Sequence, residues 1–104
     1  MNSSVDVVGI GLNATDTLIV VAHVPHYGGK EPFSDEISSV GGQVASAMVT
    51  CQRLGLKSKY IGSVGDDTQG KLQMDSLREV GVDIEHIQVR EGCATQSAYI
   101  IVDQ

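Results

Sequence analysis

Hydrophobic positions along this chain follow two periods, one typical of β-strands and one typical of helices. Residues 5–11 are rich in valine and isoleucine, which favours a strand buried on both faces of a parallel sheet. Behind Gly42 the apolar positions recur at helical spacing, and Gly55 is placed to end that helix. A second helix is predicted over residues 68–80, with Gly81 as its stop. The inward stripe of the first helix is expected to be Val44, Ala47, Met48, Cys51 and Leu54.

Five further apolar runs predict strands, at residues 17–22, 34–40, 59–64, 82–89 and 95–102. Together with the two helices they indicate an α/β protein that has a Rossmann-like parallel sheet with crossover helices. The first, second and last of these runs do not fit the strand–helix alternation. We therefore expect these three to form a small separate sheet over one edge of the parallel one.

Gly41 and Gly42 mark the point where a β-like run passes into the first helix. Glycine lets the backbone bend sharply and lie directly against a ligand. The start of a helix also leaves peptide N–H groups without intrahelical partners. These groups could donate hydrogen bonds to an oxygen-rich small molecule. A tight turn without any ligand explains the same two residues, so the pair alone leaves both interpretations open.

Two other patterns suggest chemistry more weakly. Residues 9–14 fit the G-x-G-x-x-A fingerprint of dinucleotide sites, but that fingerprint requires a helix directly behind it. The β-branched run that follows predicts a strand, so a nicotinamide-dependent oxidoreductase is the less favoured alternative. Asp66 and Asp67 could act as an acid/base pair, but directly before a predicted helix they are better explained as capping residues.

Composition narrows the classes of function. The net charge of −6, with lysine and arginine scattered singly, argues against a nucleic-acid partner. The longest apolar run, residues 18–22, is too short to cross a membrane, and we expect no secretory signal. Cys51 and Cys93 are expected to be buried free thiols in a reducing, cytoplasmic compartment. His23 and His26 lack a third ligand, so no metal site is expected.

Several patterns in order resemble the N-terminal part of the ribokinase-like (PfkB-type) carbohydrate kinases. They are Asp16 behind the first strand, a Pro/Gly loop, Gly41-Gly42 opening a helix that ends at Leu54-Gly55, Val64-Gly65-Asp66-Asp67 with Gly70, and Leu77-x-x-x-Gly81-Val82-Asp83. The resemblance extends over residues 5–102. It implies that residues 1–104 form the substrate-binding and lid portion of a ribokinase-like domain, without its ATP-binding C-terminal portion.

The resemblance also implies an activity, which is ATP-dependent phosphotransfer to a hydroxyl of a sugar or nucleoside. In that family the equivalent of Asp16 binds sugar hydroxyls, and the equivalents of Gly41 and Gly42 pack against the sugar. Gln43, Ser46 and Asn13 are expected to add secondary polar contacts. The extra strands correspond to a lid that closes over the substrate and forms a homodimer. ATP and Mg²⁺ are implied as cofactors of the full-length parent.

Some positions depart from the family pattern. The family usually has Asn where Ser46 stands and in some members Lys where Gln43 stands, and Asn13 lies three residues before Asp16 instead of two. The Gly-Ala-Gly-Asp motif that supplies the anion hole and catalytic base does not occur here. We therefore expect no catalytic residue, no ATP or Mg²⁺ site and no turnover within residues 1–104. A non-catalytic carbohydrate-binding or dimerisation module is the alternative, and we expect exposed sheet edges to make the isolated chain self-associate.

Overall fold

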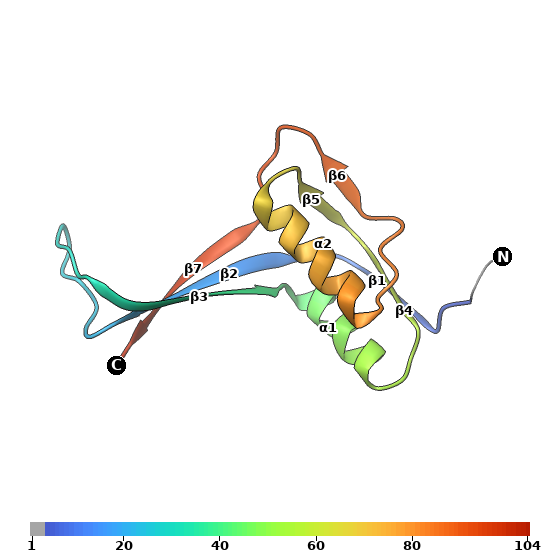
Figure 1. The fold of residues 1–104 in the computed structure, drawn as a ribbon, viewed down its shortest axis with the longest axis horizontal. Coiled ribbons are helices and arrows are strands. Elements are labelled where there is room, and N and C mark those ends of the chain that lie inside the picture. The colour runs from blue at the N-terminus through green and yellow to red at the C-terminus, as the bar shows by residue number, and fades with distance from the viewer. Residues whose placement is uncertain (1–3) are drawn as a thin grey trace.

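The computed structural model describes residues 4–104, which form an α/β body and a three-stranded sheet that projects from it (Figure 1). In chain order the elements are β1 (Val7–Ile10), β2 (Ala14–Val21), β3 (Phe33–Gly41), α1 (Gln43–Arg53), β4 (Ser58–Ile61), β5 (Ser63–Gly65), α2 (Thr68–Val80), β6 (Gln88–Arg90) and β7 (Ser97–Asp103). The molecule measures 57 × 33 × 18 Å because this sheet extends well beyond the body. No helix among residues 4–104 is long and apolar enough to cross a membrane.

The body is built on parallel strand pairs, as the sequence predicts. β1 pairs with β4, β5 pairs with β6, and all these pairs are parallel. α1 packs on β1 and β4, and α2 lies beside α1. The core joins both helices to the sheet and consists of Ala45, Met48, Tyr60, Leu77 and Val82. Gly9 lets α1 approach closely, because a Cβ there would lie 2.8 Å from the Met48 sulfur.

Both helices end where the sequence predicts. Gly55 follows α1 with φ +99°, and Gly81 ends α2 in a left-handed conformation with φ +104°. The predicted inward stripe of α1 is partly wrong. Ala45 and Met48 are the buried residues, whereas Ala47 and Leu54 are exposed. Val44, Met48 and Cys51 pack into the core as expected, and the buried face also includes Ala45 because α1 packs against α2 as well as against β1 and β4.

The other differences concern strand continuity. The run 59–64 is interrupted at Gly62, which separates β4 from β5. The prediction of one strand over residues 82–89 is wrong. Before β6 begins at Gln88, this segment forms only an isolated β-bridge between Asp83 and Lys59. The Asp83 carboxylate accepts a hydrogen bond from the Glu85 amide at 2.9 Å, which favours a turn at this point. The expectation of buried cysteines fails for Cys93, which is free and exposed, while the free thiol of Cys51 is partly buried.

The projecting sheet, made of β3, β2 and β7 in that order, confirms the predicted separate sheet. β2 runs antiparallel to β3 and parallel to β7. Because residues 14–21 form a strand, the helix that a dinucleotide fingerprint needs is missing there. Successive side chains point to opposite faces, so Ile37 and Ile100 share the face of Asp16, and Tyr99 and Ile101 lie on the other face.

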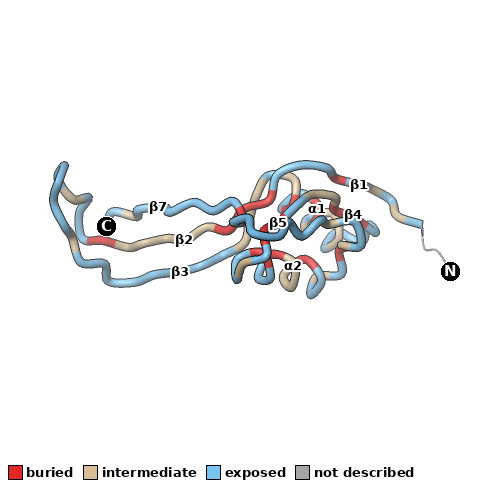
Figure 2. The backbone as a smooth tube through the Cα atoms, turned by 90° about the horizontal axis from the view of Figure 1, so that it is seen from above, coloured by how far each residue is buried: buried red, intermediate tan, exposed pale blue. Residues whose placement is uncertain are grey.

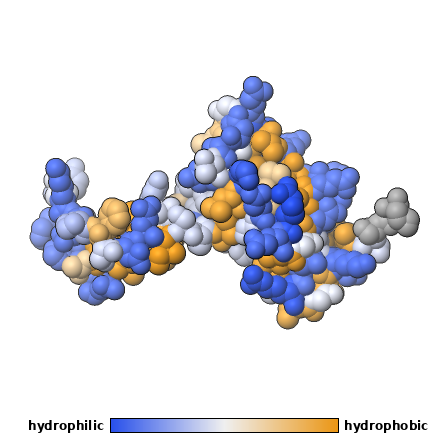
Figure 3. Space-filling view, in the orientation of Figure 1, coloured by the Kyte–Doolittle hydropathy of each residue, from blue (hydrophilic) through white to orange (hydrophobic). Residues whose placement is uncertain are grey.

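Both faces of the projecting sheet expose apolar side chains. Exposure is 46% for Ile37 and 42% for Ile100, and it is 73% for Tyr99 and 51% for Ile101. Figure 2 shows that β3 and β7 are exposed along nearly their whole length, and Figure 3 shows apolar atoms on this part of the surface. Among residues 4–104, no helix covers either face of the outer half of this sheet.

Candidate substrate-binding site

Asp16 lies on β2 where the projecting sheet leaves the body. The half-buried side chain faces Gly41, since a Cβ added to Gly41 would lie 3.0 Å from the Asp16 Oδ2 atom. Its neighbours on the adjacent strands, Ser39 and Ala98, are small. No side-chain hydrogen bond or ion pair from residues 4–104 reaches the carboxylate. Its oxygens are therefore free to accept hydrogen bonds from ligand hydroxyls.

Gly42 places the start of α1 directly against the connection between β1 and β2. Its backbone has φ +99° and ψ 140°, a region that residues with a Cβ rarely adopt. A Cβ at this position would lie 2.7 Å from the carbonyl carbon of Asn13 and 2.8 Å from the amide nitrogen of Ala14. Only glycine fits this approach. The glycine pair thus acts as the tight turn that the sequence allows, and it also brings the first turn of α1 close to Asp16.

The first turn of α1 offers free backbone donors. No side chain caps this helix, and its first turn contains no acidic residue. The Ala45 amide donates to the Leu12 carbonyl at 3.1 Å, while no protein acceptor within residues 4–104 pairs with the amides of Gln43 and Val44. Helix N-termini attract anionic or electron-rich oxygen atoms. The first turn can therefore bind a ligand oxygen through its backbone.

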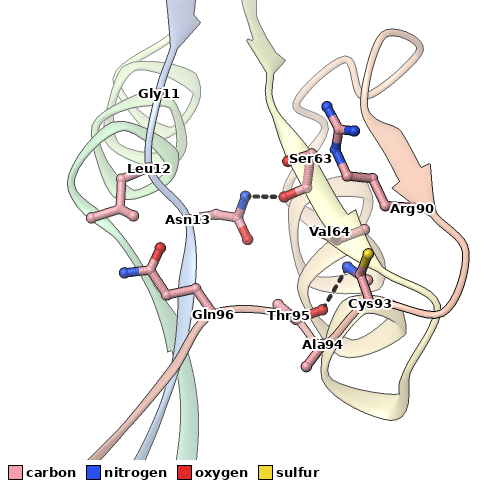
Figure 4. A pocket seen from close by; sticks show the side chains of 11 residues that line it. Gly11, Leu12, Asn13, Ser63, Val64, Arg90, Cys93, Ala94, Thr95 and Gln96 are labelled. Atoms are coloured by element: carbon pink, nitrogen blue, oxygen red, sulfur yellow. Dashed lines mark hydrogen bonds between the residues drawn. The ribbon is translucent and has the colours of Figure 1, made fainter.

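Asn13 has a structural role on the other side of the connection. Its Nδ2 donates to the Tyr60 hydroxyl at 2.8 Å and to the Ser63 carbonyl at 2.9 Å. The Tyr60 hydroxyl in turn donates to the Gly11 carbonyl. Burial raises the pKa of Tyr60, and the hydrogen bond from Asn13 lowers it by less, so the phenol keeps its proton. Figure 4 shows the amide of Asn13 directed toward Ser63 on β5.

Gln43 and Ser46 lie in the first turn of α1, directly behind the glycine pair. Gln43 is exposed as the first residue of α1, and Ser46 lines a groove of about 260 Å³ between α1 and α2. The structure therefore brings Asp16, Gly41 and the start of α1 together. Ser46 shares its groove with Gly41, whereas Asn13 lines a different cleft.

Gln73 is a site neighbour that the sequence reasoning missed. It is 1% exposed on α2, and its Nε2 lies 3.4 Å from the carbonyl oxygen of Gly41. It supports the glycine pair from the side of α2. Gln73 lies four residues before the buried Leu77, so the two side chains share one face of α2. This spacing is the sequence signal that a polar side chain is buried there and needs a hydrogen-bond partner.

The Asp66-Asp67 pair anchors the strand that completes the projecting sheet. Asp67 caps α2, since its side chain accepts from the Gly70 amide at 2.9 Å, which confirms the predicted cap. The same carboxylate accepts from the Thr95 amide at 2.8 Å and from the Thr95 hydroxyl at 2.6 Å. Asp66 accepts from the Gly92 amide at 2.9 Å. The bond from the Thr95 side chain, followed by backbone bonds from Thr95 and Gly70, lowers the pKa of Asp67. The sequence does not indicate this anchor, because Gly92 lies 26 residues from Asp66 and Thr95 lies 28 residues from Asp67.

Comparison with known proteins identifies the family of this chain. Residues 7–104 match the family model described as pfkB family carbohydrate kinase. The ATP-dependent ribose-1-phosphate kinase of Halopiger xanaduensis is 32% identical over 88 residues, which is 85% of this chain and 30% of that protein. The nucleoside kinase of Methanothermobacter thermautotrophicus is 25% identical over 103 residues, which is 99% of this chain and 33% of that protein.

Solved structures of ribokinases share the fold of this chain. The ribokinase from Giardia lamblia matches with a TM-score of 0.84 and 26% identity, over 98% of this chain and 31% of its own. The Arabidopsis thaliana ribokinase, solved with ribose and ATP, matches with a TM-score of 0.88 and 19% identity, over 97% of this chain and 33% of its own, and shows the fold alone. The chain thus spans about a third of the length of these relatives. The predicted resemblance is confirmed, and the chain belongs to the pfkB family of carbohydrate kinases.

Proposed function

We propose that the protein transfers a phosphoryl group from ATP to a hydroxyl of a sugar or nucleoside, and that residues 4–104 supply the substrate site and the lid. The observation that carries the proposal is the unpaired Asp16 carboxylate at the root of the projecting sheet, facing Gly41. Family membership supports the reaction class. So do the two relatives named as kinases of ribose 1-phosphate and of nucleosides.

The chemistry of the site suits a vicinal diol. A carboxylate can accept two hydroxyl protons at once, and each charge-assisted hydrogen bond contributes about 1.5–3 kcal/mol. The backbone amides at Gln43 and Val44 can donate to a third oxygen. Together these groups hold and orient the substrate hydroxyls, which is the part of phosphoryl transfer that depends on positioning.

ATP and Mg²⁺ are the proposed cofactors of the full-length parent. No group of three or more His, Cys, Asp or Glu side chains in this part of the chain could hold a metal ion. ATP supplies the phosphoryl group and Mg²⁺ neutralises its charge in reactions of this class. We therefore assign no residue of this chain to either cofactor.

The projecting sheet is the proposed lid. We infer that the face bearing Asp16, Ile37 and Ile100 closes over the substrate and excludes water. The opposite face, with Tyr99 and Ile101, is then free to form a homodimer contact, since exposed apolar patches of this kind mark interaction sites. A cytoplasmic location belongs to the same proposal, because both cysteines are free, as in a reducing compartment.

Substitution of Asp16 tests the substrate site. The purified protein is titrated calorimetrically with a panel of pentoses, hexoses and nucleosides, and ATP-dependent phosphorylation is measured for each ligand that binds. For the ligand that binds, Asp16→Asn should weaken affinity by about 10- to 150-fold, the equivalent of 1.5–3 kcal/mol. Glu36→Gln is the matched control, because Glu36 is an exposed carboxylate on the opposite face of β3. Unchanged binding by Asp16→Asn would disprove the assignment of this carboxylate.

A non-catalytic carbohydrate-binding or dimerisation module is the second candidate. The exposed apolar residues on both faces of the projecting sheet favour an association role. The same panel separates the two functions. Binding of a sugar without any ATP-dependent product would support the module, and formation of a phosphorylated product would support the kinase.

A further inference from the structure

Two buried side chains at the root of the projecting sheet each leave one polar atom unpaired. Thr15 on β2 is 4% exposed, and Gln73 on α2 is 1% exposed. The Thr15 Oγ1 atom and the Gln73 Oε1 atom have no hydrogen-bond partner within residues 4–104. Buried polar atoms are nearly always paired, because an unpaired one is costly. These two atoms therefore indicate a contact that this conformation does not complete.

Both side chains belong to the side of the sheet that α2 covers. α2 contacts β2 and β3 where these strands leave the body (Figure 1). Val40 of β3 lines the groove between α1 and α2 together with Gln73. Thr15 is the cross-strand partner of Val40, and the side chains of cross-strand partners point to the same face. The Thr15 hydroxyl and the Gln73 amide thus lie on the two sides of the junction between the sheet and α2.

The two unpaired atoms are complementary as donor and acceptor. The Gln73 Nε2 atom donates to the Gly41 carbonyl at 3.4 Å, which leaves Oε1 as a free acceptor. The Thr15 hydroxyl has a proton to donate. The other buried hydroxyls of residues 4–104 already donate theirs, from Ser58 to Met48, from Tyr60 to Gly11 and from Thr95 to Asp67. Asn13, which carries the third unpaired atom, lines a different cleft.

We propose that Thr15 and Gln73 are positioning residues for the substrate site, and that the Thr15 hydroxyl donates to Gln73 Oε1 when the lid closes. This inference rests on the proposed function of the projecting sheet as a lid. Thr15 moves with the sheet and Gln73 belongs to the body, so closure changes the distance between them. A bond made only in the closed state favours closure. Because Thr15 precedes Asp16, the same bond holds the carboxylate in place over the substrate.

Binding of small probes to the purified protein tests the proposal. Ribose, fructose and adenosine serve as probes of the pentose, hexose and nucleoside classes, and calorimetry measures the affinity of each. For a probe that binds, Thr15→Val and Gln73→Met should each weaken affinity by about three- to tenfold, the effect of losing one hydrogen bond. The double variant should bind about as weakly as either single variant, because both changes remove the same bond.

Matched variants distinguish this hydrogen bond from a general loss of packing. Thr15→Ser keeps the hydroxyl and should restore affinity to within about twofold of the wild type. Thr17→Val, at a half-buried position on the same face of β2, should leave affinity unchanged. Gln69→Met, at an exposed position on α2, should also leave it unchanged. Additive losses in the double variant, or a Thr15→Ser variant that binds as weakly as Thr15→Val, overturn the proposal.

Urea unfolding of the protein without a probe supplies an independent measurement. Because the Thr15 hydroxyl is unpaired in this conformation, Thr15→Val should not raise the equilibrium constant of unfolding by more than about threefold. A rise of about tenfold or more, with unchanged probe binding, would mean that an ordered water already pairs this hydroxyl, and it would overturn the proposal. Probe binding that depends on Asp16 but not on Thr15 or Gln73 refutes this inference alone. If the wild type binds none of the probes, both the proposed substrate site and this inference fail.

Discussion

Replacing Gly42 by alanine should destabilise the protein far more than the same change at Gly55. Both glycines have φ +99°, so an alanine at either position has an unfavourable φ, at a cost of about 1–2 kcal/mol in the left-handed helical region. At Gly42 the ψ of 140° lies outside that region, so the backbone cost there is at least as large. Their surroundings differ. A Cβ at Gly55 meets nothing within 4 Å, whereas one at Gly42 would lie 2.7 Å from the carbonyl carbon of Asn13.

The contact at Gly42 is with backbone, which cannot rotate away like the end of a side chain. The connection is also held in place by the bonds from Asn13 to Tyr60 and Ser63. Relieving the overlap must shift either this connection or the start of α1, and overpacking of this kind costs about 1–3 kcal/mol. Gly42→Ala should therefore lower the free energy of unfolding by about 2–5 kcal/mol in all, and Gly55→Ala by about 1–2 kcal/mol.

Urea unfolding of the two variants, followed by circular dichroism, measures this difference. In a thermal melt, each kcal/mol corresponds to about 4–8 °C for a domain of this size. The loss at Gly42 is a large part of the total stability of a typical domain, about 5–15 kcal/mol. Equal losses at both positions would refute the reasoning, because they would mean that the backbone at Asn13 yields to the new Cβ without cost.

Three other predictions follow from contacts described above. Tyr60→Phe removes the hydroxyl that Asn13 and the Gly11 carbonyl share. Urea unfolding should show that this change lowers the free energy of unfolding by about 1–3 kcal/mol. The control Tyr99→Phe, at an exposed phenol, should change it by less than about 0.5 kcal/mol. Because the folded pKa of Asp67 is lowered, its contribution to stability should be present above its unfolded pKa, about 3.9, and be lost as the pH falls through the folded value. Asp67→Asn should flatten this part of an acid unfolding curve, and an unchanged curve would contradict the anchoring role. Ile101→Glu should reduce self-association in sedimentation velocity, and a dimer that persists unchanged would argue against the proposed contact.

Much of this protein could be predicted from sequence because the signals are local. Glycine at positions 55 and 81 ends a helix through its own backbone freedom, and Asp67 caps α2 through an amide three residues away. The three strands that break the strand–helix alternation also identified the projecting sheet. For the site, Asp16 and Gly41 come together because β2 and β3 pair as neighbours in the sequence.

The remaining features depend on contacts between segments distant in the sequence. The direction of Asn13 is set by Tyr60 and Ser63, which lie 47 and 50 residues away, and no nearby residue indicates it. The anchoring of Thr95 by Asp67 is equally non-local. The contacts of Gly9 with Val44 and Met48 agree with the predicted stripe of α1, whereas Ala45 is buried in the core that α1 shares with Leu77 of α2. The sequence by itself determined which elements form and where the glycine pair and Asp16 stand. Only the tertiary structure decided which polar side chains meet, because a buried hydrogen bond depends on where the chain returns in space.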